Sequence, residues 1–376
     1  MKKLYIIIMI FFFAILLLLN ACKKETPPVF ILPAPPGTKV TLGKQIFLDV
    51  NLSTPVGQSC SSCHASSVSF SDPSHNMVSP GAATGLAGNR NAPMASYTMY
   101  FPPFHYSVED TTYEGGLFWD GRVNTLEQQA MKPFVNPLEM NNPNLSTVVA
   151  KVHSASYYPL YKKIYGEITD TTKAITNIMD AIATFERSPE LNPFTSKFDY
   201  YLAGKVSLTA QELQGMNLFN DTLKAKCANC HLTTPDPASG KVLFTDFTYN
   251  SDGVPANPYN PFYTLPVQFN ALGANYADLG LGGILNDPTL TGNFRVSSLR
   301  NIAVTAPYFH NGVFGTLEEV VHFYNTRDVP GSGFAPPEVA DNIDTEETGN
   351  QHLTAAEEAA IVAFLKTLTD GYQVGK

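Results

Sequence analysis

Two short stretches decide the architecture of this chain: CSSCH at residues 60–64 and CANCH at residues 227–231. A C-x-x-C-H motif attaches haem c, because its two thiols reach the two vinyl groups while the adjacent histidine supplies an axial nitrogen to iron. Structural zinc sites and redox dithiols also use C-x-x-C pairs. Zinc would need partner ligands that five cysteines do not offer, and a redox dithiol has no reason to carry histidine after both motifs. The sequence therefore predicts two covalent haem c groups, held by Cys60, Cys63, His64, Cys227, Cys230 and His231.

The surroundings of the two motifs also repeat. Residues 41–49 read TLGKQIFLD and residues 213–221 read LQGMNLFND, so a short amphipathic helix is expected to lead into each motif. Each half closes with a longer helical pattern, over residues 171–187 and 354–369, that places apolar side chains on one face. Helix, haem motif, loops and helix is the plan of a small c-type cytochrome. The predicted fold is therefore mainly α, with two class-I cytochrome c-like haem domains and long loops.

Length and composition agree with two folded domains. The chain has 376 residues, of which 44% are hydrophobic and 15% charged, so it is too apolar to be disordered. Its net charge of -9 argues against nucleic acid as a partner, because phosphates need a basic footprint. The helical pattern stops within residues 188–206, where proline and turn residues collect. We expect an N-terminal haem domain over residues 38–200 and a C-terminal haem domain over residues 201–376.

The N-terminus has the pattern of an export signal. Lys2 and Lys3 precede an apolar run over residues 4–19, which is too short to cross the roughly 30 Å hydrocarbon core of a membrane. A permanent transmembrane helix is therefore the weaker interpretation. We expect residues 1–21 to be a lipoprotein-type signal peptide and the protein to work on the periplasmic side, where haem c is attached.

A cysteine follows the apolar run. Residues 19–22 (LNAC) resemble a bacterial lipobox, in which Cys22 is acylated and becomes the first mature residue, although Asn20 is not the usual residue there. Cleavage by ordinary signal peptidase, with Cys22 left free, is the alternative. The proline-rich residues 22–37 would be a tether between a lipid anchor in the membrane and the folded part.

The sixth ligand of the second haem is not an obvious methionine. All nine methionines lie at or before Met216, so a methionine ligand would have to come from the first half. The other candidates are Tyr308, His310, His322, Tyr324 and His352. A capping box at Thr316 and Glu319 predicts a helix on which Tyr324 shares the apolar face, whereas His322 points elsewhere. From periodicity alone, a tyrosine packed in the core is the simpler interpretation of Tyr324.

Four dispersed segments match one family. They are GNRNAP at residues 88–93, LFWDGR at residues 117–122, EQQAMKPFVNPLEM at residues 127–140 and SLRNIAVTAPYFHNGVFGTLEEVV at residues 298–321. With them, the chain from about residue 38 to 372 resembles the bacterial di-haem cytochrome c peroxidases, and within that superfamily it leans towards the MauG type. The resemblance implies an oxidoreductase that acts on hydrogen peroxide.

The resemblance gives each haem a role. His64 would be the proximal ligand of the N-terminal haem, where peroxide binds, and His231 that of the C-terminal, electron-transfer haem. Trp119, the only tryptophan of the chain, matches the tryptophan that lies between the haems in this family. A purely structural core tryptophan is the alternative. We predict a redox bridge at Trp119.

Gln129 and Glu139 match the distal pocket of the family. Peroxide must lose a proton from one oxygen and gain it on the other before the O–O bond breaks, and a positioned glutamate can do both. A solvated surface glutamate is the alternative. The resemblance therefore predicts Gln129 and Glu139, with Trp119, as catalytic residues.

The resemblance also implies a calcium ion between the domains. Asn91, Thr305 and Pro307 match that site, through a side chain from the first and backbone carbonyls from the other two. Oxygen ligands of this kind suit a hard cation. We therefore expect one calcium ion in addition to two haems.

Two departures from ordinary peroxidases favour the MauG type. In members that need prior reduction, a histidine ahead of the G-x-R-N motif caps the first haem, but the loop at residues 80–91 (PGAATGLAGNRN) offers none. His75 lies too early and is interpreted as a surface histidine, so the first haem would be five-coordinate. Tyr324 stands fourteen residues after His310, at the position of the axial methionine of ordinary peroxidases. The resemblance thus makes Tyr324 the expected ligand of the second iron.

The sequence leaves the reaction open between related activities. We expect a di-haem c peroxidase that reduces hydrogen peroxide to water with electrons from a small periplasmic cytochrome c or cupredoxin. The alternative is a MauG-like enzyme that oxidises a protein substrate through a high-valent state. A di-haem electron carrier is less favoured, because a pure carrier needs no acid–base residue such as Glu139 above an open iron.

Overall fold

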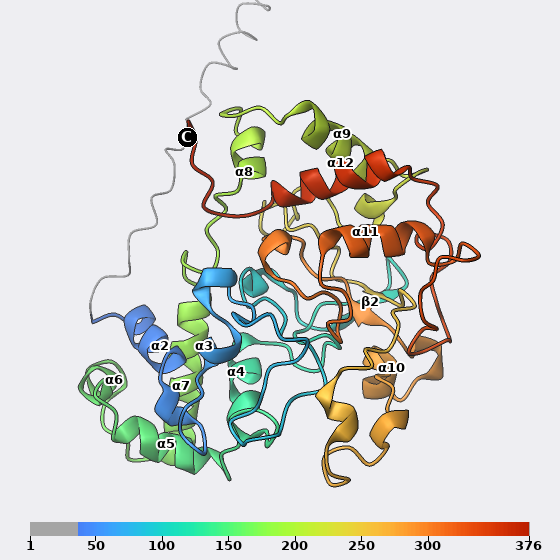
Figure 1. Ribbon diagram of the computed structural model, residues 1–376. Helices are drawn as coiled ribbons and strands as arrows, with labels where there is room; N and C mark the ends of the chain where they lie inside the picture. Colours follow the sequence, from blue (N-terminus) through green and yellow to red (C-terminus); the bar gives the residue numbers. More distant parts are fainter. Residues whose placement is uncertain (1–36, 376) are drawn as a thin grey trace, which may run out of the picture. The chain divides into compact units, whose positions relative to one another are not determined.

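The structure is a computed structural model that describes residues 37–375 (Figure 1). The expected signal peptide, the lipidation site Cys22 and residues 22–36 of the tether lie outside this range, and they stay predictions. Within residues 37–375, no helix is both long enough and apolar enough to span a membrane.

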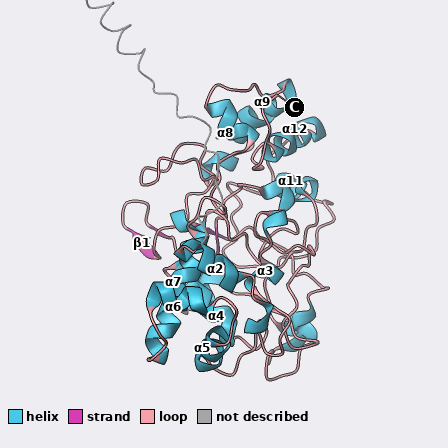
Figure 2. Cartoon of the chain, turned by 90° about the vertical axis from the view of Figure 1, so that its left-hand side faces the viewer, coloured by secondary structure: helices cyan, strands magenta, loops and turns pink. Residues whose placement is uncertain are grey.

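The described chain is mainly helical, with long loops and two short antiparallel strand pairs, which confirms the predicted mainly α class (Figure 2). The α-helices are α2 (Lys39–Phe47), α3 (Cys60–Cys63), α4 (Leu126–Val135), α5 (Leu145–His153), α6 (Tyr158–Tyr165), α7 (Thr171–Glu186), α8 (Lys197–Leu202), α9 (Ala210–Phe219), α10 (Gly280–Leu285), α11 (Leu317–Thr326) and α12 (Ala355–Lys366). The 3-10 helices are η1 (Val50–Leu52), η2 (Ser66–Val68), η3 (Thr98–Tyr100), η4 (Cys227–Asn229), η5 (Pro261–Thr264), η6 (Gly273–Asn275), η7 (Pro288–Leu290) and η8 (Ile302–Val304). The strands are β1 (His105–Ser107) with β2 (Thr112–Glu114), His105 opposite Glu114, and β3 (Tyr249–Asn250) with β4 (Phe294–Arg295), Tyr249 opposite Arg295.

Two glycines allow two helix pairs to cross closely. Helix α2 packs against α7, and α9 packs against α12 (Figure 1). A Cβ atom on Gly43 of α2 would lie 1.9 Å from the carbonyl oxygen of Ala181 in α7. A Cβ atom on Gly215 of α9 would likewise lie 1.9 Å from the carbonyl oxygen of Ala360 in α12. Because no side chain fits at either crossing, the repeat in the sequence is also a repeat in packing.

Three phenylalanine rings fill the space beside each crossing. In both sets the rings meet edge to face, with centroids 5.2 to 6.3 Å apart, an arrangement that aromatic rings favour. The first set is Phe47, Phe70 and Phe185, and the second is Phe219, Phe244 and Phe364. The members that follow the haem motifs, Phe70 and Phe244, both have positive φ angles, 62° and 55°. The phenylalanine after each motif therefore has a left-handed backbone conformation.

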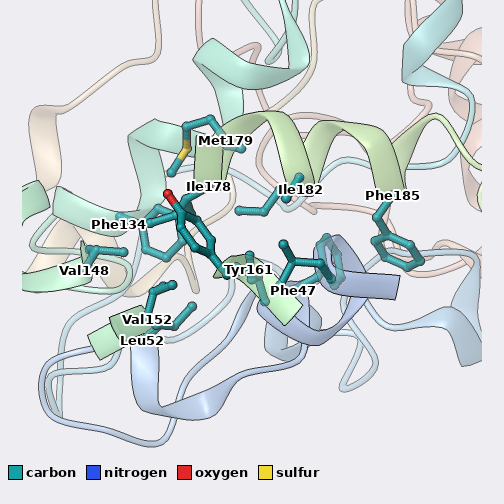
Figure 3. Close-up of a cluster of buried hydrophobic side chains, with 14 of the residues drawn as sticks. Phe47, Leu52, Phe134, Val148, Val152, Tyr161, Ile178, Met179, Ile182 and Phe185 are labelled. Carbon is teal, nitrogen blue, oxygen red and sulfur yellow. The ribbon is translucent and has the colours of Figure 1, made fainter. Parts of the chain in front are cut away.

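Each half has a hydrophobic core of its own. Figure 3 shows the first, in which Ile178, Ile182 and Phe185 of α7 face Phe47 of α2. The buried residues of this core lie between Leu42 and Leu191, and those of the second core lie between Phe198 and Leu368. The domain boundary at residue 200 stays a prediction. It falls inside α8, whose Phe198 packs in the second core.

Candidate haem cavities and active site

The first motif forms one turn of helix. Helix α3 covers Cys60–Cys63, and both thiols line a cavity of about 200 Å³ together with His64. The Nδ1 atom of His64 lies 3.0 Å from the carbonyl oxygen of Phe70. Because a carbonyl only accepts, Nδ1 carries the proton, and Nε2 is the nitrogen left to bind iron.

The second motif has the same geometry. Cys227, Cys230 and His231 line a second cavity, of about 230 Å³. The Nδ1 atom of His231 lies 3.0 Å from the carbonyl oxygen of Phe244. Burial lowers the pKa of His64, and it lowers the pKa of His231 to about 4. Both imidazoles are therefore neutral, as an iron ligand must be.

The four thiols suit thioether bonds better than thiolate chemistry. Burial raises the pKa of Cys63 to about 11 and that of Cys227 to about 12, and it raises the pKa of Cys60 and Cys230 further. Zinc sites and redox dithiols need the thiolate, whereas a thioether sulfur carries no charge. The donor set and the cavity walls therefore fit two haem c groups.

The predicted catalytic residues meet in the first cavity. Gln129 on α4 and Glu139 in the loop after it both line this cavity, beside His64. Burial raises the pKa of Glu139, although Arg122 and a hydrogen bond from Asn136 oppose the shift. A carboxyl group whose pKa is raised towards neutral pH can both accept and return a proton.

His75 does not reach this cavity. Its side chain is exposed, and its Nδ1 atom lies 2.8 Å from the carbonyl oxygen of Ala306. The interpretation of His75 as a surface histidine agrees with this position. Within residues 37–375, His64 is the only histidine that lines the first cavity.

The candidates for the sixth ligand of the second iron fall into two groups, those that line the second cavity and those that do not. Tyr308, His310 and Tyr324 line the second cavity, whereas His322 and His352 are exposed side chains away from it. His310 stacks on Phe294, with ring centroids 3.8 Å apart, and its Nε2 atom is 2.9 Å from Oε2 of Glu338. Tyr308 donates to the carbonyl of Ile302.

Tyr324 lies on α11 and faces the second cavity. Its hydroxyl donates to Oδ2 of Asp252 over 3.2 Å, and burial raises its pKa well above the ordinary tyrosine value. One methionine also lines this cavity. It is Met94, from the first half of the chain, and it lines both cavities. Met94 is thus the first-half methionine that the sequence left open as a ligand.

The two cavities share one wall. Trp119 belongs to it, and its Nε1 atom donates to the carbonyl oxygen of Asn91 over 2.9 Å. The residues that line both cavities are Asn91, Ala92, Pro93, Met94, Trp119 and Arg295. Trp119 thus lines both cavities, and its role as a redox bridge stays a prediction.

The predicted calcium ligands also come together at the second cavity. Asn91, Thr305 and Pro307 all line it, and the backbone N–H of Asn91 donates to the carbonyl of His310. Among residues 37–375 no cluster of three or more His, Cys, Asp or Glu side chains could hold a metal ion. The predicted site uses an amide and carbonyls, so the calcium ion stays a prediction.

Several charged residues at the cavities were not identified from the sequence. Among them are Glu186, which lines the first cavity, Asp252, which lines the second, and Arg295, in the shared wall. A charged residue inside an apolar pattern was the available signal. Periodicity does not show whether such a residue points to solvent or to a cavity.

Two haem c cavities on a mainly helical frame define a di-haem c-type oxidoreductase, and comparisons with known proteins agree. The family model for the di-haem cytochrome c peroxidases matches residues 37–207. The chain is 35% identical to the methylamine utilization protein MauG of Paracoccus denitrificans, over 88% of each chain. It is 31% identical to the cytochrome c551 peroxidase of Nitrosomonas europaea, over 87% of this chain and 79% of that protein.

A solved structure is similar over most of the chain. The diheme peroxidase BthA from Burkholderia thailandensis superposes with a TM-score of 0.78, at 32% identity, over 91% of this chain and 87% of that one. The chain belongs to the di-haem cytochrome c peroxidase and MauG family. It is therefore an oxidoreductase of the cytochrome c peroxidase family, and this membership implies two c-type haems.

Proposed function

We propose that the protein reduces hydrogen peroxide in the first cavity, with electrons from a small periplasmic cytochrome c or cupredoxin. Peroxide takes up two electrons and two protons, its O–O bond breaks, and two water molecules form. When bound, the first haem supplies an iron that coordinates peroxide and exchanges electrons with it. The observation that carries the proposal is that Glu139 and Gln129 line the cavity of His64.

Glu139 acts on the protons of the substrate. Its carboxylate takes a proton from one peroxide oxygen and returns it to the other, which then leaves as water. The raised pKa of Glu139 supports both steps, because a carboxyl group with an ordinary pKa would hold its proton too weakly at neutral pH. Gln129 donates a hydrogen bond from its amide and keeps the peroxide oriented beside Glu139.

The first haem site is proposed to accept peroxide without prior reduction. The only histidine close in sequence to the G-x-R-N loop, His75, is exposed and bonded to the Ala306 carbonyl. His64 would hold the iron of the first haem, and no second histidine of residues 37–375 lines this cavity. Trp119, in the shared wall, is proposed to carry electrons between the two cavities.

A second candidate function rests on Tyr324. We propose this residue as the ligand of the second iron, because it faces the second cavity on the same helix face as Val321 and Leu317. A phenolate favours ferric over ferrous iron and so opposes routine delivery of electrons from a cytochrome c. With 35% identity to a MauG protein, this feature favours oxidation of a protein substrate docked on the second half.

Two further assignments accompany the proposed function. We propose that Asn91, Thr305 and Pro307 bind calcium, which predicts a lower melting temperature with a chelator and recovery on adding calcium but not magnesium.

We also propose export and lipidation of Cys22, which predicts fatty-acid labelling that the Cys22→Ser variant loses.

The test of the proposed function is Glu139→Gln. The variant keeps the shape of the side chain but removes its capacity to move a proton, so peroxide turnover is expected to fall by about 10²- to 10⁴-fold. Glu109→Gln is the matched control, because Glu109 is exposed. Steady-state turnover with a reduced small cytochrome measures both, after the two-haem content has been verified. Unchanged turnover in Glu139→Gln would remove the assigned role.

A further inference from the structure

One arginine differs from the others in having no acidic partner. The chain has six arginines, all within residues 37–375, and five of them form ion pairs with Asp or Glu side chains there. The five are Arg90, Arg122, Arg187, Arg300 and Arg327. The sixth, Arg295, is only 5% exposed, and no ion pair forms to it within the described residues.

The backbone and the stem of Arg295 are held firmly. In β4 its N–H donates to the carbonyl of Trp119 over 2.9 Å, and its Nε atom donates to the carbonyl of Phe118 over 3.2 Å. The guanidinium carbon lies 4.2 Å from the centroid of the Phe101 ring. The Nη1 atom is buried and has no hydrogen-bond partner among residues 37–375. The group is thus fixed in place with donors unused.

Nearby groups do not neutralise this cation. Asp120 is the nearest acidic influence, but its carboxylate pairs with Arg90 and Arg122. The Tyr249 hydroxyl, also close, donates to the carbonyl of Gly115. Burial lowers the pKa of Arg295 to about 10, so at neutral pH the guanidinium remains charged. A buried charge without a partner is strongly unfavourable, which indicates that a partner is supplied from outside the polypeptide.

The place of Arg295 indicates the chemistry of that partner. It lines both cavities, in the wall that also contains Trp119. A planar guanidinium matches a carboxylate through two parallel hydrogen bonds. The propionates are the carboxylates of haem, and each haem brings two of them. Two haems that meet at one wall can place a propionate there from either side.

We propose that Arg295 binds a haem propionate where the two cavities meet and so positions that haem edge beside Trp119. The proposal rests on the two-haem assignment but not on the peroxide reaction. Its guanidinium donates through Nη1 and Nη2 to the propionate oxygens. Arg295 is therefore a cofactor-positioning residue rather than one that touches peroxide.

The test compares Arg295→Gln and Arg295→Lys with wild type in the holoprotein. The readouts are haem stoichiometry and the two midpoint potentials from optical redox titration. Removal of the positive charge disfavours the more negative ferrous state, so Arg295→Gln is expected to lower one midpoint potential. We expect a tenfold or larger change in that reduction equilibrium, which is 59 mV or more for one electron. Arg295→Lys keeps the charge but loses the planar fork, and we expect a smaller shift of the same haem.

The haem whose potential shifts identifies the source of the propionate. Lys173→Gln is the control, because Lys173 is an exposed cation that lines neither cavity, and both potentials should stay at wild-type values. A purely structural role would change the melting temperature without a selective shift of one haem. If Arg295→Gln leaves both potentials unchanged, the proposal is wrong. Where that variant does not retain two haems, unchanged potentials in Arg295→Lys overturn it instead.

Discussion

The two halves of the molecule share a frame and differ at the positions that face the cavities. Gly43 and Gly215 make the same close crossing, and His64 and His231 bond the carbonyls of equivalent phenylalanines at the same 3.0 Å distance. This frame fixes the proximal histidine in both halves. Any difference in chemistry between the two cavities must therefore come from positions at which the two halves have different side chains.

Equivalent positions on the last helix of each half show the difference most directly. Gly43 packs against Ala181 and Gly215 packs against Ala360, so these two alanines occupy equivalent positions. Glu186, five residues after Ala181 in α7, therefore corresponds to Leu365, five residues after Ala360 in α12. Both side chains line their cavity. The first cavity thus has carboxyl groups at Glu186 and Glu139, whereas the second is apolar at the equivalent helix position. The shared frame therefore presents a carboxyl group to one cavity and an apolar side chain to the other.

The largest expected effect is the pH dependence caused by Glu186. Burial raises its pKa to about 8, and its Oε2 atom has no hydrogen-bond partner in the part of the chain that the structure describes. Because the folded state holds this proton more tightly than the unfolded chain, stability is highest below the ordinary glutamate pKa and falls as the pH rises towards 8. Each unit of pKa shift corresponds to about 1.4 kcal/mol, so the wild-type protein should lose on the order of 3 to 5 kcal/mol of unfolding free energy as the pH rises. The Glu186→Leu variant should not show this loss.

Guanidinium unfolding of the holoprotein from pH 5 to pH 9 measures this effect. Arg187 and Glu127 are the charged groups that influence the pKa of Glu186, and they remain in place in the variant. The difference between the wild-type and Glu186→Leu profiles therefore isolates one carboxyl group. Parallel profiles would mean that Glu186 is ionised in the folded protein, and the contrast with Leu365 would lose its chemical meaning.

The next effect concerns the ligand of the second iron. Tyr324→Met would give the second haem the ligands of an ordinary high-potential site, so its midpoint potential is expected to rise on the order of 0.1 V or more. Tyr308→Phe is the matched control, because Tyr308 lines the same cavity and bonds a backbone carbonyl. A shift in Met94→Leu with none in Tyr324→Met would assign the ligand to Met94.

The smallest effect tests the shared frame. Gly43→Ala and Gly215→Ala should each destabilise the protein by about 1 to 3 kcal/mol, because the helices must separate to admit a methyl group. The two losses should be similar, since both added Cβ atoms would lie 1.9 Å from a carbonyl oxygen. Gly315→Ala is the control, as its Cβ would come no closer than 3.7 Å to a neighbour. Thermal unfolding measures all three, and clearly unequal losses would show that the two crossings are not equivalent.

Local signals predicted much of this frame. The capping box at Thr316 with Glu319 is confirmed at the start of α11. The helix expected over residues 171–187 is found as Thr171–Glu186, and the one expected over 354–369 is shorter, Ala355–Lys366. Capping and amphipathic spacing depend on residues close in sequence, so they are visible without a structure.

The cavity charges could not be predicted in the same way. Glu186 lies in the last turn of α7, where a charged residue is usually solvated, but it is buried and close enough to influence Cys60 of the first haem motif. Arg295 lies in a two-residue strand whose place is set by Trp119 and Phe118, far away in sequence. Both residues owe their surroundings to long-range contacts, which periodicity does not contain.

The central claim is that the first cavity is open to peroxide in the resting protein, and one optical experiment tests it most directly. The diferric holoprotein is mixed with one equivalent of hydrogen peroxide, without any prior reduction, and the spectrum is followed from the time of mixing. We expect an immediate spectral change in wild type and a much slower one in Glu139→Gln. A wild-type spectrum that stays unchanged until one haem has been reduced would contradict the account, because it would require a sixth ligand on the first iron.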